Sequence, residues 1–415
     1  CTSLVNLVIP DSVTNIGTSS FYGCSGLTNL VLGNNLISIG NTAFLSCSSL
    51  TQVFVPPNIM SIGNLALHIG GLITVDPLNP AYSSQNGVLF DKNFNVLLDC
   101  PIGVLGSYTI PNTVASIEGA AFQSCTNLTA INIPSSITTI STSAFSSCSG
   151  LTNLVIPDSV TSFGIYAFLN CSQLQQVTTG NGITRIANDA FQNCSSLKNV
   201  IMTTNVTSIG SYAFASCGSL VSFSIPPYVT NIDSYAFAFD SSLISITLPD
   251  PLVSIGNFAW GSFAFYYCTS LKSVIVGQNL SYIPDGTFGE CPSLTGIYFK
   301  GNAPTYHVNF TYGSPVTVYY LPGTSGWGTS LAGVPTAIWL PTMQTSMTVS
   351  NAPANPFGFN INWAKGMVVA VDAGTNLVKP VWQALGTNTL TSDTIYFSDP
   401  QSTNYPNRFY RLRAL

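Results

Sequence analysis

The sequence predicts a solenoid of short, stacked parallel β-strands, followed by a small all-β module. Three observations lead to this prediction. Cysteines recur every 23 residues, a fixed pattern of apolar residues recurs with them, and only 6% of the 415 residues are charged. A period of roughly 20 to 50 residues indicates stacked units, because one such unit cannot bury its own apolar side.

Residues 148–170 show the repeat most clearly. The unit opens with the pattern L-x-x-L-x-I, which is typical of a short strand. Pro157 ends this strand, because proline has no N–H for the ladder. Further apolar residues then turn inward, Gly164 allows a tight backbone, and Ala167 and Phe168 are expected to form a short helical turn. We expect about 11 such repeats, each with one short parallel strand.

These motifs resemble the BspA-type leucine-rich repeat. The L-x-x-L-x-I-P strand, the V-x-x-I-G turn and the A-F-x-x-C closing turn recur in phase, with eleven closing turns between Phe21 and Phe288. The resemblance covers residues 1–300, which we expect to form the solenoid domain. It implies a secreted or cell-surface protein that binds other proteins, cells or matrices.

An irregular insert interrupts the stack at about residues 71–107. Residues 75–101 match an insert that is typical of the same family. Their apolar alternation predicts a β-hairpin in which Gly87–Phe90 pairs with Val96–Leu98. Cys100 lies in this insert, outside the 23-residue register.

The repeat pattern fades after Cys291. Residues 301–341 contain one further strand, within Val316–Pro322, and are predicted to form the C-terminal cap that a solenoid needs. Residues 342–415 are predicted to form a small all-β module, whose ending Arg408–Arg413 is similar to C-terminal tails of secreted proteins of environmental bacteria. Four apolar alternating segments support this module: Phe357–Ile361, Met367–Val371, Thr394–Phe397 and Phe409–Leu412.

The repeat cysteines are expected to be free and buried. Equivalent residues in adjacent turns stand about 4.8 Å apart with their Cβ atoms side by side, a geometry that disfavours disulfides. A disulfide framework and a lipid-modified first residue are the alternatives. The expected buried ladder consists of Cys1, Cys24, Cys47, Cys125, Cys148, Cys171, Cys194, Cys217, Cys268 and Cys291.

Two positions depart from the cysteine register. Gly70 and Asp240 each stand 23 residues after a cysteine, where another cysteine is due. The step from Asp240 to Cys268 is 28 residues, which a five-residue insertion around Trp260 explains.

The composition excludes several classes of function. Ten basic residues among 415 cannot neutralise a row of phosphates, so nucleic acid is not an expected partner. No apolar run approaches the roughly 18 residues that a spanning helix needs, so no transmembrane segment is expected.

No catalytic, metal-binding or cofactor-binding site is predicted. Only His68 and His307 could act as acid–base groups near neutral pH, and no motif flanks either residue. Asp11, Asp158 and Asp250 follow strand-ending prolines and are interpreted as turn residues. The sequence has no C-x-x-C pair, P-loop or nucleophile motif. We therefore expect no enzyme activity and no cofactor.

Outward-facing strand positions form two columns on the expected concave face of the sheet. The apolar column has two interpretations: β-branched residues suit any sheet surface, whereas adjacent exposed apolar residues usually mark a partner site. The candidate binding residues of the polar column are Asn6, Asn29, Gln52, Asn153 and Asn199. Those of the apolar column are Val8, Val31, Phe54, Val155, Ile201, Ile275 and Tyr298.

Two functions are compatible with these patterns. The first is extracellular or cell-surface binding or adhesion, in which the concave sheet recognises a protein or a neutral glycan because it carries few charges. The second is a structural subunit of a filament or surface layer. An uncapped first turn and a nearly uncharged surface would allow head-to-tail assembly into a homopolymer. A monomer whose N-terminal cap precedes Cys1 is the alternative to the filament.

Overall fold

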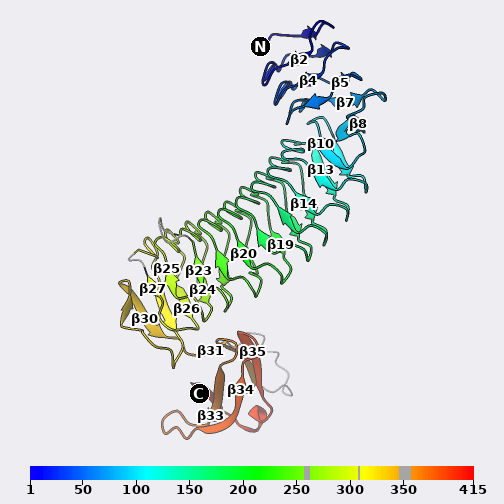
Figure 1. Ribbon diagram of the computed structural model, residues 1–415. Coiled ribbons are helices and arrows are strands. Elements are labelled where there is room, and N and C mark those ends of the chain that lie inside the picture. Colours follow the sequence, from blue (N-terminus) through cyan, green and yellow to red (C-terminus); the bar gives the residue numbers. More distant parts are fainter. Residues whose placement is uncertain (257–261, 307–308, 345–356) are drawn as a thin grey trace.

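The computed structural model describes residues 1–256, 262–306, 309–344 and 357–415. These residues form an elongated solenoid with a β module beyond its C-terminal end (Figure 1). The predicted fold class, a solenoid of parallel strands followed by an all-β C-terminal part, is confirmed. Trp260, around which an insertion is expected, lies outside the described residues.

The concave face is built from one short strand in each turn. Most of these strands pair in parallel with the equivalent strand of the next turn, so that equivalent residues such as Asn153 and Gln176 lie side by side. The ladder is interrupted between β3 and β5 and between β7 and β11. Between β19 and β22 the ladder narrows to a single bridge, Ser222–Ser245. The concave strands are β1 (Asn6–Val8), β3 (Asn29–Val31), β5 (Gln52–Val55), β7 (Leu72–Val75), β11 (Gly106–Thr109), β13 (Leu128–Asn132), β15 (Asn153–Val155), β17 (Gln176–Thr178), β19 (Asn199–Ile201), β22 (Ser245–Thr247), β24 (Ser273–Val276) and β26 (Gly296–Phe299).

A second ladder follows the strand-ending proline in most turns. The V-x-x-I-G segment places two residues in extended conformation, and its isoleucine points into the core. The repeat thus contributes two strands, of which the sequence pattern indicated only the longer one. The short strands are β2 (Asn15–Ile16), β4 (Ser38–Ile39), β6 (Ser61–Ile62), β12 (Ser116–Ile117), β14 (Thr139–Ile140), β16 (Ser162–Phe163), β18 (Arg185–Ile186), β20 (Ser208–Ile209), β21 (Asn231–Ile232), β23 (Ser254–Ile255), β25 (Tyr282–Ile283) and β27 (Thr305–Tyr306).

The closing turn is not the short helix that the sequence pattern suggested. Tyr166 and Asn170 both have φ of 61°, in the left-handed region. Left-handed residues on either side of Phe168 break any helical run and direct backbone groups toward the next turn. The N–H groups of Phe168 and Asn170 donate to the carbonyl oxygens of Ala190 and Gln192, each at 2.9 Å. The closing turn therefore contributes a third set of hydrogen bonds between neighbouring turns.

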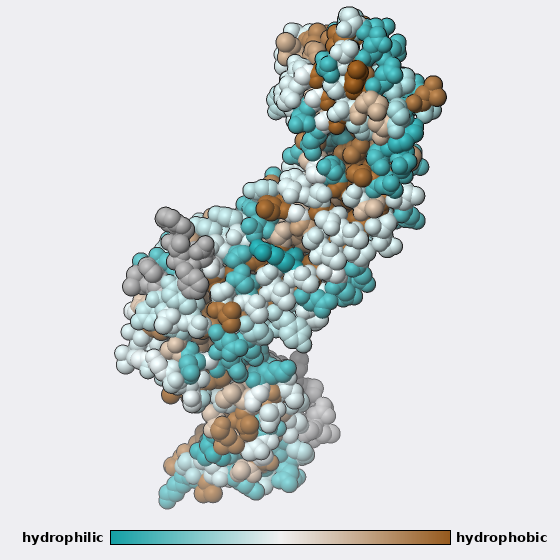
Figure 2. Space-filling model, viewed as in Figure 1, coloured by the Kyte–Doolittle hydropathy of each residue, from teal (hydrophilic) through white to brown (hydrophobic). Residues whose placement is uncertain are grey.

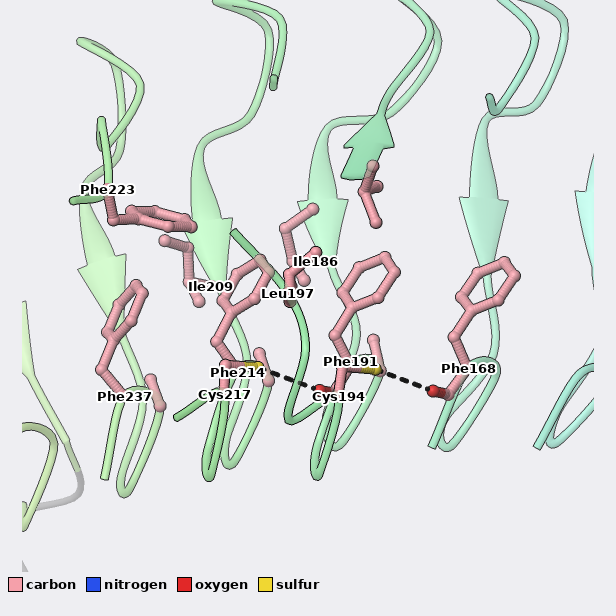
Figure 3. Packing of buried hydrophobic residues seen from close by; sticks show 14 of the residues in the cluster. Phe168, Ile186, Phe191, Cys194, Leu197, Ile209, Phe214, Cys217, Phe223 and Phe237 are labelled. Carbon is pink, nitrogen blue, oxygen red and sulfur yellow. Dashed lines mark hydrogen bonds between the residues drawn. The ribbon is translucent and has the colours of Figure 1, made fainter. Parts of the chain in front are cut away.

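Stacked phenylalanines fill the interior of the solenoid (Figure 3). Eight successive rings, from Phe122 to Phe288, stack with centroids between 4.8 and 5.5 Å apart. Phe21 and Phe44 form a separate pair at 5.2 Å in the N-terminal turns. The core is accordingly divided into an N-terminal cluster and a longer central cluster.

The insert lies where these two clusters meet. The predicted hairpin is present: β9 (Val88–Asp91) pairs antiparallel with β10 (Val96–Asp99). A further strand, β8 (Tyr82–Gln85), pairs antiparallel with β9. Because β10 also pairs in parallel with β12, the insert extends the second ladder and does not leave the stack.

The solenoid sheet continues beyond Cys291. Two strands, β28 (Thr317–Tyr320) and β30 (Val334–Ile338), extend it in parallel, and β29 (Ser330–Leu331) pairs antiparallel with β30. Residues 301–341, which were expected to form the cap, thus extend the concave sheet by two strands.

The C-terminal module consists of two antiparallel sheets with strand orders β31-β32-β35 and β34-β33-β36. The four predicted segments fall in β32 (Phe357–Asn362), β33 (Val368–Gly374), β35 (Thr394–Asp399) and β36 (Phe409–Ala414). The sequence pattern missed the short β31 (Thr342–Gln344) and also β34 (Gln383–Thr389), which is largely polar and exposed. The helical element of the described residues is a 3₁₀ turn, Ser402–Asn404.

The arginine-rich ending fixes the last strand of the module. Nε of Arg411 and Nε of Arg413 lie 2.9 and 2.7 Å from Oδ2 of the buried Asp372 on β33. Nε of Arg408 lies 2.7 Å from Oδ2 of the buried Asp399 on β35. The alternation of Arg411 and Arg413 places both guanidinium groups on the same side of β36.

Candidate functional site

The apolar column is exposed along the N-terminal turns. Val8, Val31 and Phe54 occupy equivalent positions in the first three turns and are 63%, 47% and 52% exposed. Val8 and Val31 are direct neighbours in the β1–β3 ladder. Hydrophobic residues are visible among polar ones on this end of the solenoid in Figure 2. The column therefore presents consecutive apolar side chains to solvent.

The polar column lies beside it. Asn6, Asn29 and Gln52 are exposed in the same three turns. Because side chains two residues apart on a strand point to the same face, each amide stands next to an apolar side chain. The N-terminal part of the concave face thus combines apolar contact area with amide hydrogen-bonding groups.

The columns continue in the central turns with gaps. Val155 and Ile201 are 64% and 56% exposed, and Thr178 stands between them. Asn153 and Asn199 of the polar column are also exposed. Among the described residues, the exposed apolar side chains of this column are therefore consecutive only in the N-terminal turns.

Two positions of the apolar column are covered. Ile275 and Tyr298 are half-buried and pack against the core of the C-terminal module. The expectation that both side chains lie on an open face was wrong, because the C-terminal module packs against the last turns of the concave face. The sequence could not indicate this contact, since the module has no repeat in register with the solenoid.

The cysteine ladder lies in the core, and the cysteines are free. Cys194 Sγ donates to the carbonyl of Phe168 at 3.4 Å, and Cys217 Sγ to that of Phe191 at 3.3 Å (Figure 3). Burial raises the pKa of both thiols, so they stay protonated and can donate. The side chain is thus a hydrogen-bond donor between turns as well as a space filler.

Cys1 differs from the rest of the ladder. It is exposed, so its inclusion among the buried cysteines was wrong. Cys100 is buried outside the register, and its carbonyl accepts the Cys125 thiol at 3.2 Å, as a phenylalanine carbonyl does elsewhere.

His68 is buried and fully hydrogen-bonded. Its Nδ1 lies 2.7 Å from Oδ1 of Asp99, and its Nε2 faces the carbonyl of Gln123. Burial disfavours the imidazolium, but the charge and hydrogen bond of Asp99, with the Gln123 carbonyl, raise the pKa of His68 above its usual 6.5. With an acceptor at each ring nitrogen, His68 links the third turn to Asp99 of the insert and to Gln123 of the closing turn that follows the insert. His307 lies outside the described residues.

The aspartates after the strand-ending prolines have structural partners. Asp11, Asp158 and Asp250 each accept a backbone N–H of the next turn through Oδ1, at 2.7, 2.7 and 3.2 Å. Across residues 1–256, 262–306, 309–344 and 357–415, no three His, Cys, Asp or Glu side chains are placed to hold a metal ion. The same residues include no helix of the length and apolar character that crossing a membrane requires.

Comparisons with known proteins agree with the repeat pattern. Residues 1–79, 103–220 and 185–315 match the family model described as BspA type leucine rich repeat region. A leucine-rich repeat protein from Eubacterium ventriosum is 25% identical with a TM-score of 0.54, over 61% of this chain and 75% of that one. A leucine rich cell surface protein from Faecalibacterium prausnitzii is 26% identical with a TM-score of 0.45, over 72% of this chain and 80% of that one. No curated protein matches the sequence.

Proposed function

Because the chain belongs to the family of BspA-type leucine-rich repeat proteins, we propose that it is a secreted or cell-surface binding or adhesion protein without catalytic activity. Its concave sheet recognises a protein or a neutral glycan. The observation that carries the proposal is the row of exposed apolar side chains at Val8, Val31 and Phe54.

Strand propensity alone does not account for this row. It explains valines on a sheet surface, but a half-exposed phenylalanine beside two exposed valines leaves contiguous apolar area in water. The neighbouring amides of Asn6, Asn29 and Gln52 supply donors and acceptors next to that area. A surface of this kind fits a partner that offers apolar contact and neutral hydrogen-bonding groups.

The lack of charged residues in the N-terminal turns indicates which class of partner this surface favours. Residues 12–75 contain no Asp, Glu, Lys or Arg. The N-terminal concave face therefore has no charged group of its own between Asp11 and Asp76 with which to attract an ionic ligand. Proteins with an apolar patch and neutral glycans are the partners that this surface favours.

A double variant, Val31→Asp with Phe54→Asp, tests the proposal. Beads coated with the full chain are applied to an array of neutral glycans and to a panel of immobilised extracellular proteins. We expect the double variant to bind about tenfold or more weakly than the parent chain. On binding, its two new carboxylates would be buried against the partner's apolar surface. Thermal stability is expected to stay within a few degrees of the parent chain, because both side chains are exposed.

The matched control is Ile37→Asp with Met60→Asp. Ile37 and Met60 are exposed apolar residues of the same two turns, next to the second ladder and off the concave face. Equal loss of binding in both double variants, or no binding by the parent chain to either panel, would contradict the proposed surface.

A structural subunit remains the second candidate function, because the nearly uncharged surface provides little repulsion between copies. Light scattering and electron microscopy of the chain, with and without residues 342–415, distinguish the two. Filaments that require the C-terminal module would favour assembly, and a monodisperse monomer at high concentration in both forms would exclude it.

A further inference from the structure

A cavity of about 580 Å³ lies between the last strands of the concave face and the C-terminal module. Its solenoid side is formed by β24, β26 and β28, and its module side by residues around Trp363 and Asp393. The volume lies within the roughly 300–1,000 Å³ that is typical of small-ligand sites. Both parts of the chain are needed to form it.

Aromatic side chains form one side of the cavity. The rings of Tyr298 and Tyr319 stack with centroids 4.8 Å apart, and Trp339 lies 5.1 Å from Tyr298 at a tilt of 56°. Gly296 makes room for this group, because a Cβ there would lie 2.7 Å from the Tyr298 ring. The Trp363 indole N–H donates to the Trp339 carbonyl at 2.9 Å and holds the module against the solenoid.

Asp393 is the centre of the polar side. Its Oδ1 accepts the backbone N–H of Lys365 at 2.7 Å and lies 3.7 Å from Nζ of Lys300, whereas Oδ2 takes part in neither contact. Within the described part of the chain, no hydrogen bond occupies the phenol groups of Tyr298 and Tyr319. The cavity therefore offers neutral phenols and a carboxylate oxygen, while Lys300 balances the charge of Asp393.

We propose that this cavity binds a short neutral saccharide. A sugar ring has C–H faces that pack against aromatic side chains, and hydroxyl groups at its edge that donate to carboxylate oxygens and bond with phenols. Asp393 Oδ2 accepts a sugar hydroxyl, and the phenol groups of Tyr298 and Tyr319 donate or accept. An anionic or cationic ligand is disfavoured, because it would have to compete with the Lys300–Asp393 pair.

The site is separate from the exposed columns of the N-terminal turns and goes beyond the function proposed for them. Tyr298, which the sequence placed in the apolar column, here lines the cavity between the solenoid and the module. The two sides of the cavity come from solenoid strands and from module residues that are separated in sequence, so sequence patterns did not indicate the site.

Calorimetric titration of the full chain tests the proposal with four uncharged disaccharides: maltose, cellobiose, lactose and N,N′-diacetylchitobiose. We expect saturable binding of at least one of them, with a change in tryptophan fluorescence because Trp339 and Trp363 line the cavity. Tyr319→Ala and Asp393→Asn are each expected to weaken binding about tenfold or more, since central contacts dominate affinity.

Tyr396→Ala is the matched control, because Tyr396 is an exposed tyrosine of the same module outside the cavity lining. Ser273→Phe is a second test that fills the cavity without deleting a packing group, and it should abolish binding while circular dichroism stays unchanged. The double variant Val31→Asp with Phe54→Asp should bind the disaccharide as the parent does, which separates this site from the concave-face proposal.

Three results would overturn the saccharide site. The first is no saturable binding of any of the four disaccharides by the full chain. The second is binding that both Tyr319→Ala and Asp393→Asn leave unchanged. The third is binding of a proline-rich peptide, and of none of the disaccharides, that the same two variants weaken, which would assign the cavity to a peptide ligand.

Discussion

In the solenoid most turns repeat the contacts of the turn before, whereas the two sheets of the C-terminal module pair antiparallel strands of unlike sequence. The contacts that recur from turn to turn in the solenoid are neutral: stacked phenylalanines, thiols that donate to carbonyls, and backbone ladders. The module instead buries Asp372 and Asp399 against three arginines. Five of the ten basic residues lie in residues 342–415.

The difference has a physical reason. A repeated turn can satisfy its polar groups with the identical groups of its neighbour, so charges are not needed and would repel when stacked at strand spacing. A small module made of unlike strands lacks such identical neighbouring groups. A carboxylate buried in it destabilises the fold strongly unless a specific cation pairs with it. Periodicity therefore allows a neutral core, whereas a non-repeating module specifies its last strand with ion pairs.

The largest effect is expected from interrupting the phenylalanine stack. Phe191 is fully buried, with its ring 5.3 and 5.4 Å from the rings of Phe168 and Phe214. Phe191→Ala should lower the free energy of unfolding of the solenoid by about 4 kcal/mol, because it removes apolar burial and leaves a cavity. Chemical denaturation followed by circular dichroism measures the loss. Phe54→Ala, which removes a half-exposed ring, should cost less than about 1 kcal/mol, and equal losses would show that stacking is not what stabilises the turns.

A smaller effect is expected from removing the central carboxylate of the module. Asp372→Asn should destabilise the module by about 2 kcal/mol, because the guanidinium groups of Arg411 and Arg413 lose their charged partner. The solenoid offers a contrast in Asp233, whose carboxylate forms an exposed ion pair with Arg185, so Asp233→Asn should have little effect. Hydrogen exchange of the module and of the solenoid measures the two separately. Equal protection losses would remove the distinction between the two regions.

The same carboxylate predicts that the module loses stability in acid. The Arg413 hydrogen bond first, together with Arg411, lowers the pKa of Asp372 below its usual 3.8. The stabilisation is therefore complete above about pH 4 and is lost as the pH falls through the lowered value. Hydrogen exchange of the module should lose this acid-dependent component in Asp372→Asn. An unchanged acid dependence in this variant would contradict the assignment.

The third effect, a gain, is expected where the solenoid departs from its neutral pattern. Asp240 occupies a cysteine position, is fully buried, and accepts the Cys217 N–H at 2.8 Å through Oδ1, while its Oδ2 has no partner among the described residues. Burial raises the pKa of Asp240 well above 3.8. Asp240→Cys should restore the repeat and stabilise the chain by about 1–2 kcal/mol at pH 7.

The sign of its pH dependence distinguishes this gain from better packing. With a raised pKa in the folded state, Asp240 costs more stability as the pH rises from about 4 toward that raised value. The gain from Asp240→Cys should therefore grow between pH 4 and pH 7. Asp240→Asn, which keeps the shape without the charge, should show the same growth. A gain that is independent of pH in both variants would point to packing alone.

The spacing of the cysteines predicts much of the solenoid. Equivalent residues at intervals of 23 must stack, so the inward positions of Phe168, Cys171 and Leu154, and the outward position of Val155, followed directly from the period. The hairpin of the insert was also predictable, because its apolar alternation is local. Short-range patterns of this kind are independent of the rest of the chain.

Other features carried no signal that sequence patterns could detect. The left-handed conformation of Tyr166 is one, since tyrosine does not favour positive φ and only the cross-turn hydrogen bonds select it. The strand β34 is another, because its polar exposed residues lack alternation and its pairing with β33 defines it. The hydrogen bond donated by the Cys194 thiol is a third, because its acceptor, the Phe168 carbonyl, lies 26 residues earlier and only the fold brings the two together.

The sequence by itself therefore determined the repeat, its core residues and the outward columns, because a period of 23 residues gives every turn the same neighbours. The tertiary structure alone decided how much of the concave face is open. The C-terminal module packs over Ile275 and Tyr298 and creates a cavity with Trp363 and Asp393, which are far from both in sequence. Contacts between a repeating and a non-repeating part have no period, so only the folded chain reveals them.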